Sequence, residues 1–311
     1  MQTNSIISKD NETQIKKNKL KRAIFIIAMI IVPMANFLLF YVYVNASSIL
    51  MAFQKTTLMG DRILTFDWFK LIIEGLFVRK DMLLYLENTM YYFLTSLLVV
   101  LPLTTLIAYF IYKKIIIYKF FRIMFFLPSI FSAVVLTTIF KQILGLEGPI
   151  ASKFAEIFNL TATPEFFNDS KYATGAILAY CVWTGFGTNL ILMAGAMARI
   201  PEDVLEAGQL DGVSWIKELS AIIIPLVWPT FTTLIVLTFV GIFTASGPIL
   251  LFTKGQYDTS TISYFIFSQV YFGNGSKEYA AAVGLFFTVF SVPIIVGIKK
   301  LMERWQDAIE Y

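Results

Sequence analysis

The chain has 311 residues, of which 57% are hydrophobic and 15% are charged, whereas about 25% charged residues is usual in a soluble domain. A soluble chain of this length has too little interior to hide so much apolar surface, so the composition indicates an integral membrane protein. The sequence has no histidine and one cysteine, Cys181, which excludes zinc sites, disulfide frameworks and histidine-dependent catalytic dyads or triads. The net charge of +4 is too small to indicate nucleic acid as a partner.

The chain begins with a polar tail, residues 1–22, that ends in a cluster of basic residues. The apolar run 23–44 follows and is about 22 residues long, which is enough for one bilayer crossing. A basic flank before an apolar run is also typical of a cleaved signal peptide, but this run is too long and further apolar runs follow it. We therefore expect an uncleaved first transmembrane helix.

Five further apolar runs predict five more membrane spans, each near or above the roughly 20 residues that a crossing needs. They cover Thr89–Tyr112, Ile123–Phe140, Ala173–Ala198, Ile222–Phe252 and Ala280–Ile298. Prolines lie in or at the ends of these runs, where neighbouring helices can satisfy the freed backbone groups. The sequence thus predicts an all-α integral membrane fold with six transmembrane helices.

Lysine and arginine cluster in the tail 1–22, in the link 113–122 and directly after the last apolar run. Because basic residues in short loops stay in the cytoplasm, we expect all three segments, and hence both termini, on that side. The predicted parts are a cytoplasmic tail 1–22, a first transmembrane helix 23–44, an extracytoplasmic segment 45–88, a transmembrane core 89–300 and a cytoplasmic tail 301–311.

The link 199–221 also falls in the cytoplasm by this count, although acidic residues outnumber basic ones there. Its charged residues are Glu202, Asp203, Glu206, Asp211 and Glu218 against Arg199 and Lys217. Pro201 and the acids after it predict the start of a short helix, and Gly212 predicts its end. Ser214 is expected to cap a second helix that runs on to Pro225.

Residue spacing gives the short helix two different faces. Glu206 lies three positions after Asp203 and four after Glu202, so these acids share one face, and Gly208 and Gly212 share another. A linker lying on the membrane surface would present basic residues to anionic lipid, whereas the inner leaflet would repel an acidic face. We therefore expect the acidic face to bind a protein partner with basic groups.

Part of this link resembles a motif of one transporter family. The run Glu-Ala-Gly at 206–208, followed by Gly212, Ile222 and Pro225, resembles the EAA motif of ABC importer permeases. The resemblance covers roughly residues 85–300 and is strongest to the MalF-like carbohydrate permeases. Such a resemblance implies a type I ABC importer permease fold in a bacterial plasma membrane, with the link 199–221 as the coupling loop.

Two departures from the family pattern affect what can be inferred from the resemblance. Gly208 stands where the motif has its second alanine, and Gly255-Gln256-Tyr257 stands where the carbohydrate branch has a Gly-Gly-Pro turn. The first exchange is small and compatible with a coupling role. The second removes support for any substrate detail taken from better-known relatives.

The resemblance implies a set of partners: a second permease subunit of similar fold, two cytoplasmic ATPase subunits and an extracytoplasmic substrate-binding protein, besides membrane lipid. The sequence lacks the phosphate-binding motif G-x-x-x-x-G-K-[ST]. ATP is therefore expected on the partner subunits, and the chain is expected to be a transport subunit that needs no cofactor and catalyses no bond change.

By the same resemblance, one set of residues would couple transport to ATP hydrolysis. Its members are Glu202, Asp203, Glu206, Ala207, Gly208, Asp211, Gly212, Ile222 and Pro225. Glu206 would pair with a basic or polar group of the ATPase, and Gly212 would allow close approach at the helix turn. A desolvated acid needs such a partner.

Neutral polar residues inside the predicted spans are the candidates for the solute path, because no predicted span has a central acid or base. The candidates are Trp183, Asn189, Thr238, Thr244 and Ser246. The alternative role for each is helix–helix packing, in which such residues are common. Asn189 can both donate to and accept from a hydroxyl group, and Trp183 offers an aromatic face to a sugar ring.

An uncharged interior of this kind favours a neutral sugar or oligosaccharide over a polyamine or a phosphate. Three alternatives remain open at this point: an ABC permease for a non-sugar solute, an ion-coupled secondary carrier and a membrane scaffold without a pore. The absence of central acids disfavours the carrier, since proton relays in transporters use intramembrane carboxylates.

Overall fold

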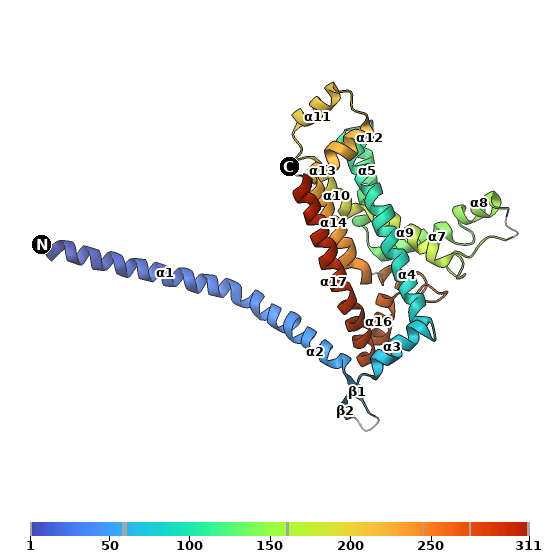
Figure 1. Ribbon diagram of the computed structural model, residues 1–311, viewed down its shortest axis with the longest axis horizontal. Coiled ribbons are helices and arrows are strands. Elements are labelled where there is room, and N and C mark those ends of the chain that lie inside the picture. Colours follow the sequence, from blue (N-terminus) through green and yellow to red (C-terminus); the bar gives the residue numbers. More distant parts are fainter. Residues whose placement is uncertain (1, 58–60, 160–161, 245, 274, 310–311) are drawn as a thin grey trace. The chain divides into compact units, whose positions relative to one another are not determined.

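A computed structural model describes residues 2–57, 61–159, 162–244, 246–273 and 275–309 of the chain. The chain divides into two compact units, Met1–Thr65 and Phe66–Tyr311, which are described separately. Helices make up most of both units (Figure 1), as the composition and the apolar runs predict.

The first unit is a long helix followed by a hairpin. The helix comprises α1 (Gln2–Asn36), the π-helical η1 (Phe37–Tyr43) and α2 (Val44–Ala52) without a break, and strands β1 (Gln54–Thr56) and β2 (Arg62–Leu64) pair antiparallel. This corrects the predicted first helix, 23–44, at both of its ends. The all-α fold class is confirmed, and the described residues add one short hairpin in the segment predicted to be extracytoplasmic.

The second unit is helical throughout its described residues. Its elements are α3 (Asp67–Phe77), α4 (Asp81–Thr95), η2 (Ser96–Val100), α5 (Leu101–Tyr112), α6 (Tyr118–Phe126), η3 (Leu127–Ser129), α7 (Ala133–Leu144), α8 (Pro149–Ile157), α9 (Ala173–Thr184), α10 (Phe186–Met197), α11 (Glu202–Leu210), α12 (Trp215–Lys217), η4 (Glu218–Ile223), α13 (Ile224–Leu226), α14 (Trp228–Val240), η5 (Gly241–Phe243), α15 (Gly247–Phe252), α16 (Ile262–Tyr271) and α17 (Lys277–Ile309).

Five helical stretches in the described residues are long and apolar enough to cross a membrane. They are Asn18–Ala52, Asp81–Tyr112, Ala133–Ile157, Ala173–Met197 and Lys277–Trp305. A sixth span results if Trp215–Leu226 and Trp228–Phe243, which meet at an 80° bend, are taken together. The number of spans therefore agrees with the predicted six when this bent pair counts as one.

Two of the predicted spans are not continuous helices. The predicted span Ile123–Phe140 is interrupted, because α6 ends at Phe126 and a new helix, α7, begins after Ser132, whose hydroxyl accepts a hydrogen bond from the Val134 amide at 3.3 Å. Pro128 lies in this break, where its missing N–H interrupts the helical hydrogen bonds.

The predicted span Ile222–Phe252 is likewise not one helix. It bends between α13 and α14, next to Pro225 and Pro229, and its last residues form the separate helix α15. Proline removes a helical N–H and disfavours helical geometry in the residue before it, which accounts for the bend at this point.

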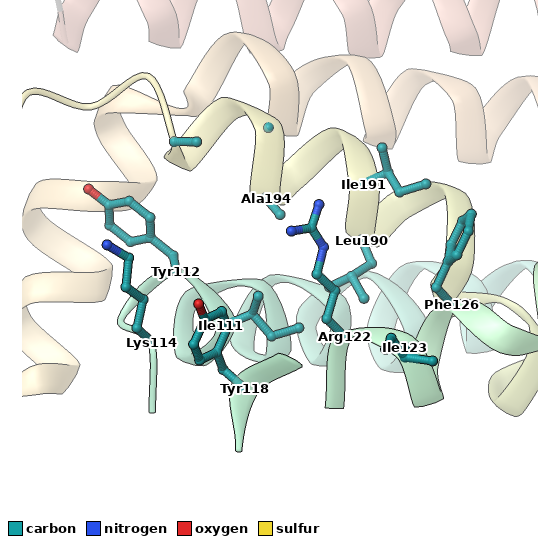
Figure 2. Close-up of a pocket in the computed structure, with 12 residues that line it drawn as sticks. Ile111, Tyr112, Lys114, Tyr118, Arg122, Ile123, Phe126, Leu190, Ile191 and Ala194 are labelled. Atoms are coloured by element: carbon teal, nitrogen blue, oxygen red, sulfur yellow. The ribbon is translucent and has the colours of Figure 1, made fainter. Parts of the chain in front are cut away.

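The core of the second unit centres on α5 and α10, which pack against each other and share a buried cluster with η4 and α14. Its members are Leu101, Ala108, Tyr109, Ile111, Leu190, Met193, Met197, Ile200, Ile223, Val227 and Leu234. A second cluster joins α4, α7, α9, α15 and α16. Beside the first cluster, α5, α6 and α10 border an open pocket of about 620 Å³ (Figure 2).

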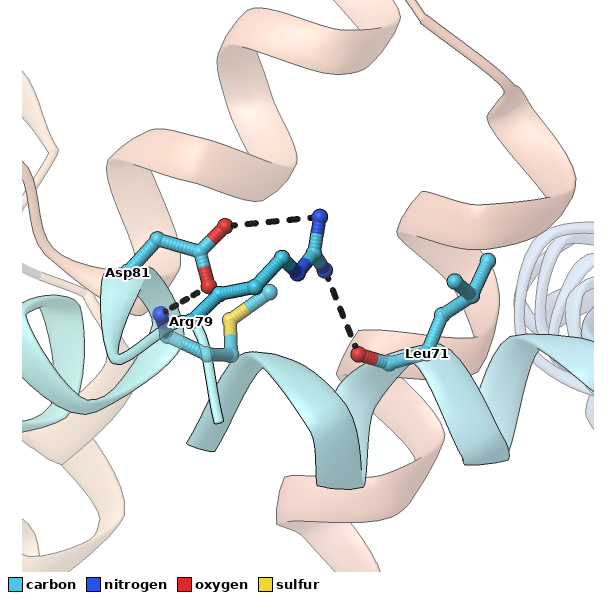
Figure 3. Close-up of polar contacts among 4 residues, drawn as sticks. Leu71, Arg79 and Asp81 are labelled. Atoms are coloured by element: carbon cyan, nitrogen blue, oxygen red, sulfur yellow. Dashed lines mark hydrogen bonds and ion pairs between the residues drawn. The ribbon is translucent and has the colours of Figure 1, made fainter. Parts of the chain in front are cut away.

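Helices α3 and α4 meet in a corner that side chains hold in place (Figure 3). Arg79 Nη2 donates to the Leu71 carbonyl at 3.4 Å, and Nη1 lies 3.8 Å from Asp81 Oδ2. Asp81 Oδ1 accepts from the Met82 amide at 2.8 Å, at the first turn of α4. The connecting Lys80 has a left-handed φ of 63°. Much of the segment predicted as an outside loop, 45–88, is therefore ordered helix.

Of the segments predicted to be cytoplasmic, those in the second unit share one end of it. Figure 1 places α11, α12 and the carboxyl end of α17 there, with α3 and α16 at the opposite end. Lys113, at the end of α5, lies at the same end, because its ammonium group is 2.8 Å from the Glu218 carboxylate at the start of η4.

This ion pair generates a stability prediction. Glu218→Gln keeps the size of a buried side chain but leaves the Lys113 ammonium group without its counter-charge. We expect a loss of about 1–3 kcal/mol in the free energy of unfolding, the range for a buried group left without its partner, measured by denaturant unfolding of the purified chain in detergent.

The matched control is Glu303→Gln on α17. Glu303 pairs with Lys299 at 3.7 Å, but its side chain is 52% exposed, against 7% for Glu218. An exposed pair of this kind contributes at most about 0.5 kcal/mol. Equal losses in the two variants would show that burial of the Lys113–Glu218 pair has no energetic consequence.

Candidate functional site

The short helix predicted in the link 199–221 is present as α11. It begins at Glu202 after Pro201, whose ψ of 136° is extended, and it ends before Gly212, whose φ is +69°. Both the predicted start and the predicted end are confirmed. Proline fits this start because it has no N–H to satisfy, and glycine fits this end because it adopts a left-handed φ at little cost.

The acidic residues of α11 are exposed and available to a partner. Glu202, Asp203 and Glu206 on the helix, and Asp211 after it, all face solvent, and none makes a hydrogen bond or an ion pair within the described part of the chain. Leu210 beside them is 89% exposed. The surface of α11 therefore combines negative charge with a protruding apolar side chain.

Glu218 differs from the other acids of the link. Its side chain is buried against Lys113, so its charge is compensated within the chain. The sequence placed it among the five acids of the link, and nothing in the local pattern indicated a partner 105 residues away. Four of these five acids are therefore exposed to a partner.

Gly208 allows the close contact between α11 and the bundle. It is buried, and a Cβ atom at this position would lie 3.1 Å from Ile222 Cδ1 in η4. At Gly212, where the resemblance implies close approach of the ATPase, a Cβ atom would meet nothing of this chain within 4 Å, and that expectation stays a prediction. Within this chain, Gly208 and Ile222 make the close contact, and Gly212 supplies the left-handed turn.

The second half of the link re-enters the bundle through a distorted helix. Ser214 takes the N-cap position of α12 with an extended ψ of 153°, but its side chain makes no capping hydrogen bond. The π-helical η4 follows and leads to Pro225 in α13, beside the 80° bend. The predicted position of the second helix is confirmed, whereas the predicted side-chain cap is wrong.

A cavity of about 380 Å³ lies between α4, α9, α10 and α14, next to η2 and η5. Asn189, Thr238 and Thr244, three of the five predicted path residues, line it. The described residues that line this cavity are all uncharged, and apart from these three they are mostly apolar or aromatic. Volume and composition fit a small-molecule site, which is typically a mostly apolar pocket with a few placed polar groups.

The polar groups of the cavity have hydrogen-bonding capacity to spare. The hydroxyls of Thr238 and Thr244 donate to backbone carbonyls of their own turns at 2.9 and 2.7 Å, which leaves their oxygen lone pairs as acceptors. Asn189 Nδ2 makes only a long bond of 3.4 Å to the Gly185 carbonyl. The cavity lining therefore offers both hydrogen-bond donors and hydrogen-bond acceptors, and this combination suits the hydroxyl groups of an alcohol.

Sequence reasoning missed Tyr92, which also lines the cavity. Its hydroxyl is buried and has no hydrogen-bond partner in the described residues, although buried tyrosine hydroxyls usually have one. The Tyr92 ring points inward because of how α4 is rotated about its own axis. In a nearly uniform apolar run, the sequence gives little indication of that rotation.

Two predicted path residues lie elsewhere. Trp183 stacks on Phe140, with ring centroids 6.0 Å apart, and is 37% exposed. Ser246 is absent from the residues that line the cavity, and its amide donates to the Thr244 carbonyl at 2.8 Å. Neither residue is therefore among those that line the cavity with Asn189, Thr238 and Thr244, although Ser246 is bonded to the backbone of Thr244.

Lys141 lies within a candidate span. It is part of α7 in the stretch Ala133–Ile157, which also contains Glu147, Lys153 and Glu156. Its ammonium group donates to the Leu251 carbonyl at 2.7 Å and lies 5.7 Å from the centre of the Phe252 ring. The predicted span Ile123–Phe140 ended just before Lys141, whose contacts in the structure lie outside the cavity lining.

Comparison with known proteins connects this geometry to a family. Residues 100–306 match the family of binding-protein-dependent transport system inner membrane components. The chain belongs to this family. The matched segment contains α11, η4 and every residue assigned above to the coupling loop and to the cavity except Tyr92, Phe93 and Ser96.

Several family members are similar in sequence. The maltose/maltodextrin permease MalF of Vibrio vulnificus is 25% identical over 195 residues, which cover 59% of this chain and 36% of MalF. The lactose permease LacF of Rhizobium radiobacter is 24% identical over 223 residues, covering 70% of this chain and 73% of LacF. The arabinooligosaccharide permease AraP of Bacillus subtilis is 25% identical over 210 residues, covering 66% and 64%. The chain thus spans about a third of the length of MalF.

Solved structures share the fold. A bacterial ABC transporter that imports the acidic polysaccharide alginate contains a chain with a TM-score of 0.78 at 21% identity, covering 92% of this chain and 98% of that one. The same score, at 22% identity, is found for the alginate transporter in complex with its alginate pentasaccharide-bound periplasmic protein. The predicted type I permease fold is confirmed.

The contact between Gly208 and Ile222 generates a packing prediction for this family member. Gly208→Leu forces a side chain into the space that Ile222 fills, and overpacking of this kind costs about 1–3 kcal/mol. We expect a correspondingly lower free energy of unfolding, measured in detergent, and partial recovery in the double variant Gly208→Leu/Ile222→Ala.

The neighbouring residue provides the control for this packing test. Ala207 is exposed on the same helix, so Ala207→Leu adds the same bulk without entering the contact. We expect the free energy of unfolding of this variant to stay within about 0.5 kcal/mol of the wild-type value, as is usual for surface substitutions. A loss as large as that of Gly208→Leu would contradict the contact.

Proposed function

We propose that this chain is the membrane-spanning permease subunit of an ATP-driven, binding-protein-dependent importer that carries a sugar or oligosaccharide into the cytoplasm. Membership of the inner-membrane component family supports the transport role. The observation that carries the choice of solute is the uncharged, hydroxyl-rich cavity at Asn189 and Thr238. The relatives MalF, LacF and AraP are permeases named for maltose, lactose and arabinooligosaccharides.

The proposed assembly contains a second permease of similar fold, two cytoplasmic ATPase subunits and a substrate-binding protein outside the membrane. The alginate transporter, whose permease chain has this fold, was solved with a periplasmic protein bound, which supports the last of these partners. The end of the second unit that carries α11 faces the cytoplasm in this arrangement, as do both termini, in agreement with the basic residues of the flanking segments.

The coupling loop transmits the movement of the ATPase to the cavity. The exposed row Glu202, Asp203 and Glu206 contacts basic groups of the ATPase, and α11 follows the closure of that subunit. Because only the turn at residues 198–201 separates α11 from α10, which carries Asn189, displacement of α11 alters the cavity. Glu206 is the residue whose carboxylate makes the pair that holds α11 in its groove.

Glu206→Gln tests this coupling role. Removing the charge weakens a charge-assisted hydrogen bond, of about 1.5–3 kcal/mol, so we expect the ATPase to bind about tenfold or more weakly and ATP-driven uptake to fall with it. Uptake and ATPase copurification are measured in proteoliposomes that hold the whole importer.

The control for the coupling test is Glu303→Gln, an exposed acid at the same end of the unit that is not on α11. It should leave uptake unchanged. If Glu206→Gln binds the ATPase and transports as well as Glu303→Gln does, the acidic face of α11 has no part in coupling.

Asn189→Ala and Tyr92→Phe test the cavity. Each removes a hydrogen-bonding group from a residue of the cavity lining, so we expect the KM for sugar uptake to rise about fivefold to tenfold, corresponding to about 1–1.5 kcal/mol for one hydrogen bond. Thr233→Ala on α14 is the control, because Thr233 is exposed and does not line the cavity. An unchanged KM in both cavity variants, with normal ATP hydrolysis, would place the sugar path elsewhere and leave the coupling role intact.

A further inference from the structure

The open pocket between α5, α6 and α10 is chemically unlike the cavity. It holds two basic side chains, Lys114 and Arg122, and no acid among its lining residues. Neither cation makes a side-chain hydrogen bond or an ion pair within the described part of the chain. Both residues are exposed, so the pocket offers uncompensated positive charge at its surface, whereas the partly buried Lys113 and Lys141 of this unit are both satisfied.

The two cations lie at one end and in the middle of the pocket, and the other end is apolar. Figure 2 shows Lys114 beside Tyr112 at one end, Arg122 reaching into the space between α6 and α10, and Phe126 with Ile191 at the other end. The surface thus changes from cationic and hydroxyl-bearing to fully apolar along its length. A ligand that matches it has an anionic head and an apolar tail.

The pocket exists because α10 carries small residues on this face. Ala194, Gly195 and Ala198 follow Ile191 at steps of three and four, and a Cβ atom added to Gly195 would meet nothing within 4 Å. At about 100° per residue, this face lies roughly 190° around α10 from Asn189. The pocket is therefore on the side of α10 that faces away from the cavity, and a solute in the cavity does not pass it.

We propose that this pocket is a binding site for an anionic phospholipid. The phosphate lies between Lys114 and Arg122, and an acyl chain follows Ile123, Phe126 and Ile191. Basic pockets between transmembrane helices bind anionic head groups in this way. The site is independent of the solute that the importer carries.

The test measures lipid bound to the importer purified with its partner subunits, by native mass spectrometry. The probes are phosphatidylglycerol, phosphatidylethanolamine and free glycerol 3-phosphate. We expect selective retention of phosphatidylglycerol, and in Lys114→Gln/Arg122→Gln an apparent affinity for it about thirtyfold lower, on a scale of about fivefold for each cation near a membrane surface.

Two further variants separate the pocket from general surface charge. Lys119→Gln removes an exposed cation of α6 that does not line the pocket and should leave retention unchanged. Gly195→Leu fills the pocket without a clash and without changing its charge, and it should reduce phosphatidylglycerol binding at least tenfold.

Several outcomes overturn the proposal. Equal retention of phosphatidylethanolamine, equal loss in Lys119→Gln, or undiminished binding in Gly195→Leu would show that the lipid binds without using the pocket. Binding of glycerol 3-phosphate as tight as that of the lipid would leave an anion site with no role for the apolar end. A photo-crosslinker at Ile191 that captures a polypeptide in the assembled importer would show instead that the pocket is a protein interface.

Discussion

The ion pair between Lys113 and Glu218 fixes the coupling loop to the helical bundle. Glu218 is 6% exposed, and a carboxylate removed from water to this extent costs several kcal/mol unless a cation compensates it. Lys113 closes α5, and Glu218 opens η4, whose Ile223 belongs to the same buried cluster as residues of α5 and α10. The helix that re-enters the bundle is thus held by charge at its first residue and by packing at its last.

One face of α11 packs against the bundle, and its acidic face is exposed to solvent. Gly208 brings α11 into contact with Ile222, and Gly212 turns the chain between them with a backbone conformation that few other residues accept. The acids of α11 face away from this contact into solvent. Leu205 of α11 also packs against the buried cluster of the bundle, so a partner that moves α11 acts on a short helix in contact with the bundle and not on an irregular loop.

Hydropathy and spacing predicted the class of fold, the number of spans and the bounds of α11, because each depends on local sequence alone. The breaks after Phe126 and near Pro229 were not predicted, since an apolar run has the same composition whether or not its helix is continuous. The partner of Glu218 and the inward direction of Tyr92 were also missed. Both depend on how helices far apart in sequence are rotated against one another, which periodicity in nearly uniform apolar runs leaves undetermined.

The charged groups inside the second unit lie outside the lining of the cavity that we propose as the solute path, and this bears on how transport is powered. Ion-coupled carriers use a titratable group within reach of the solute, whereas the charged groups inside the described bundle, Lys141 and the Lys113–Glu218 pair, are satisfied by contacts outside the cavity lining. In the proposed importer, work on the solute then arrives as helix movement. Because α10 carries Asn189 at the cavity and is linked to α11 by the short turn 198–201, we propose it as the mechanical route, with the packing of α5 against α10 spreading that displacement through the core.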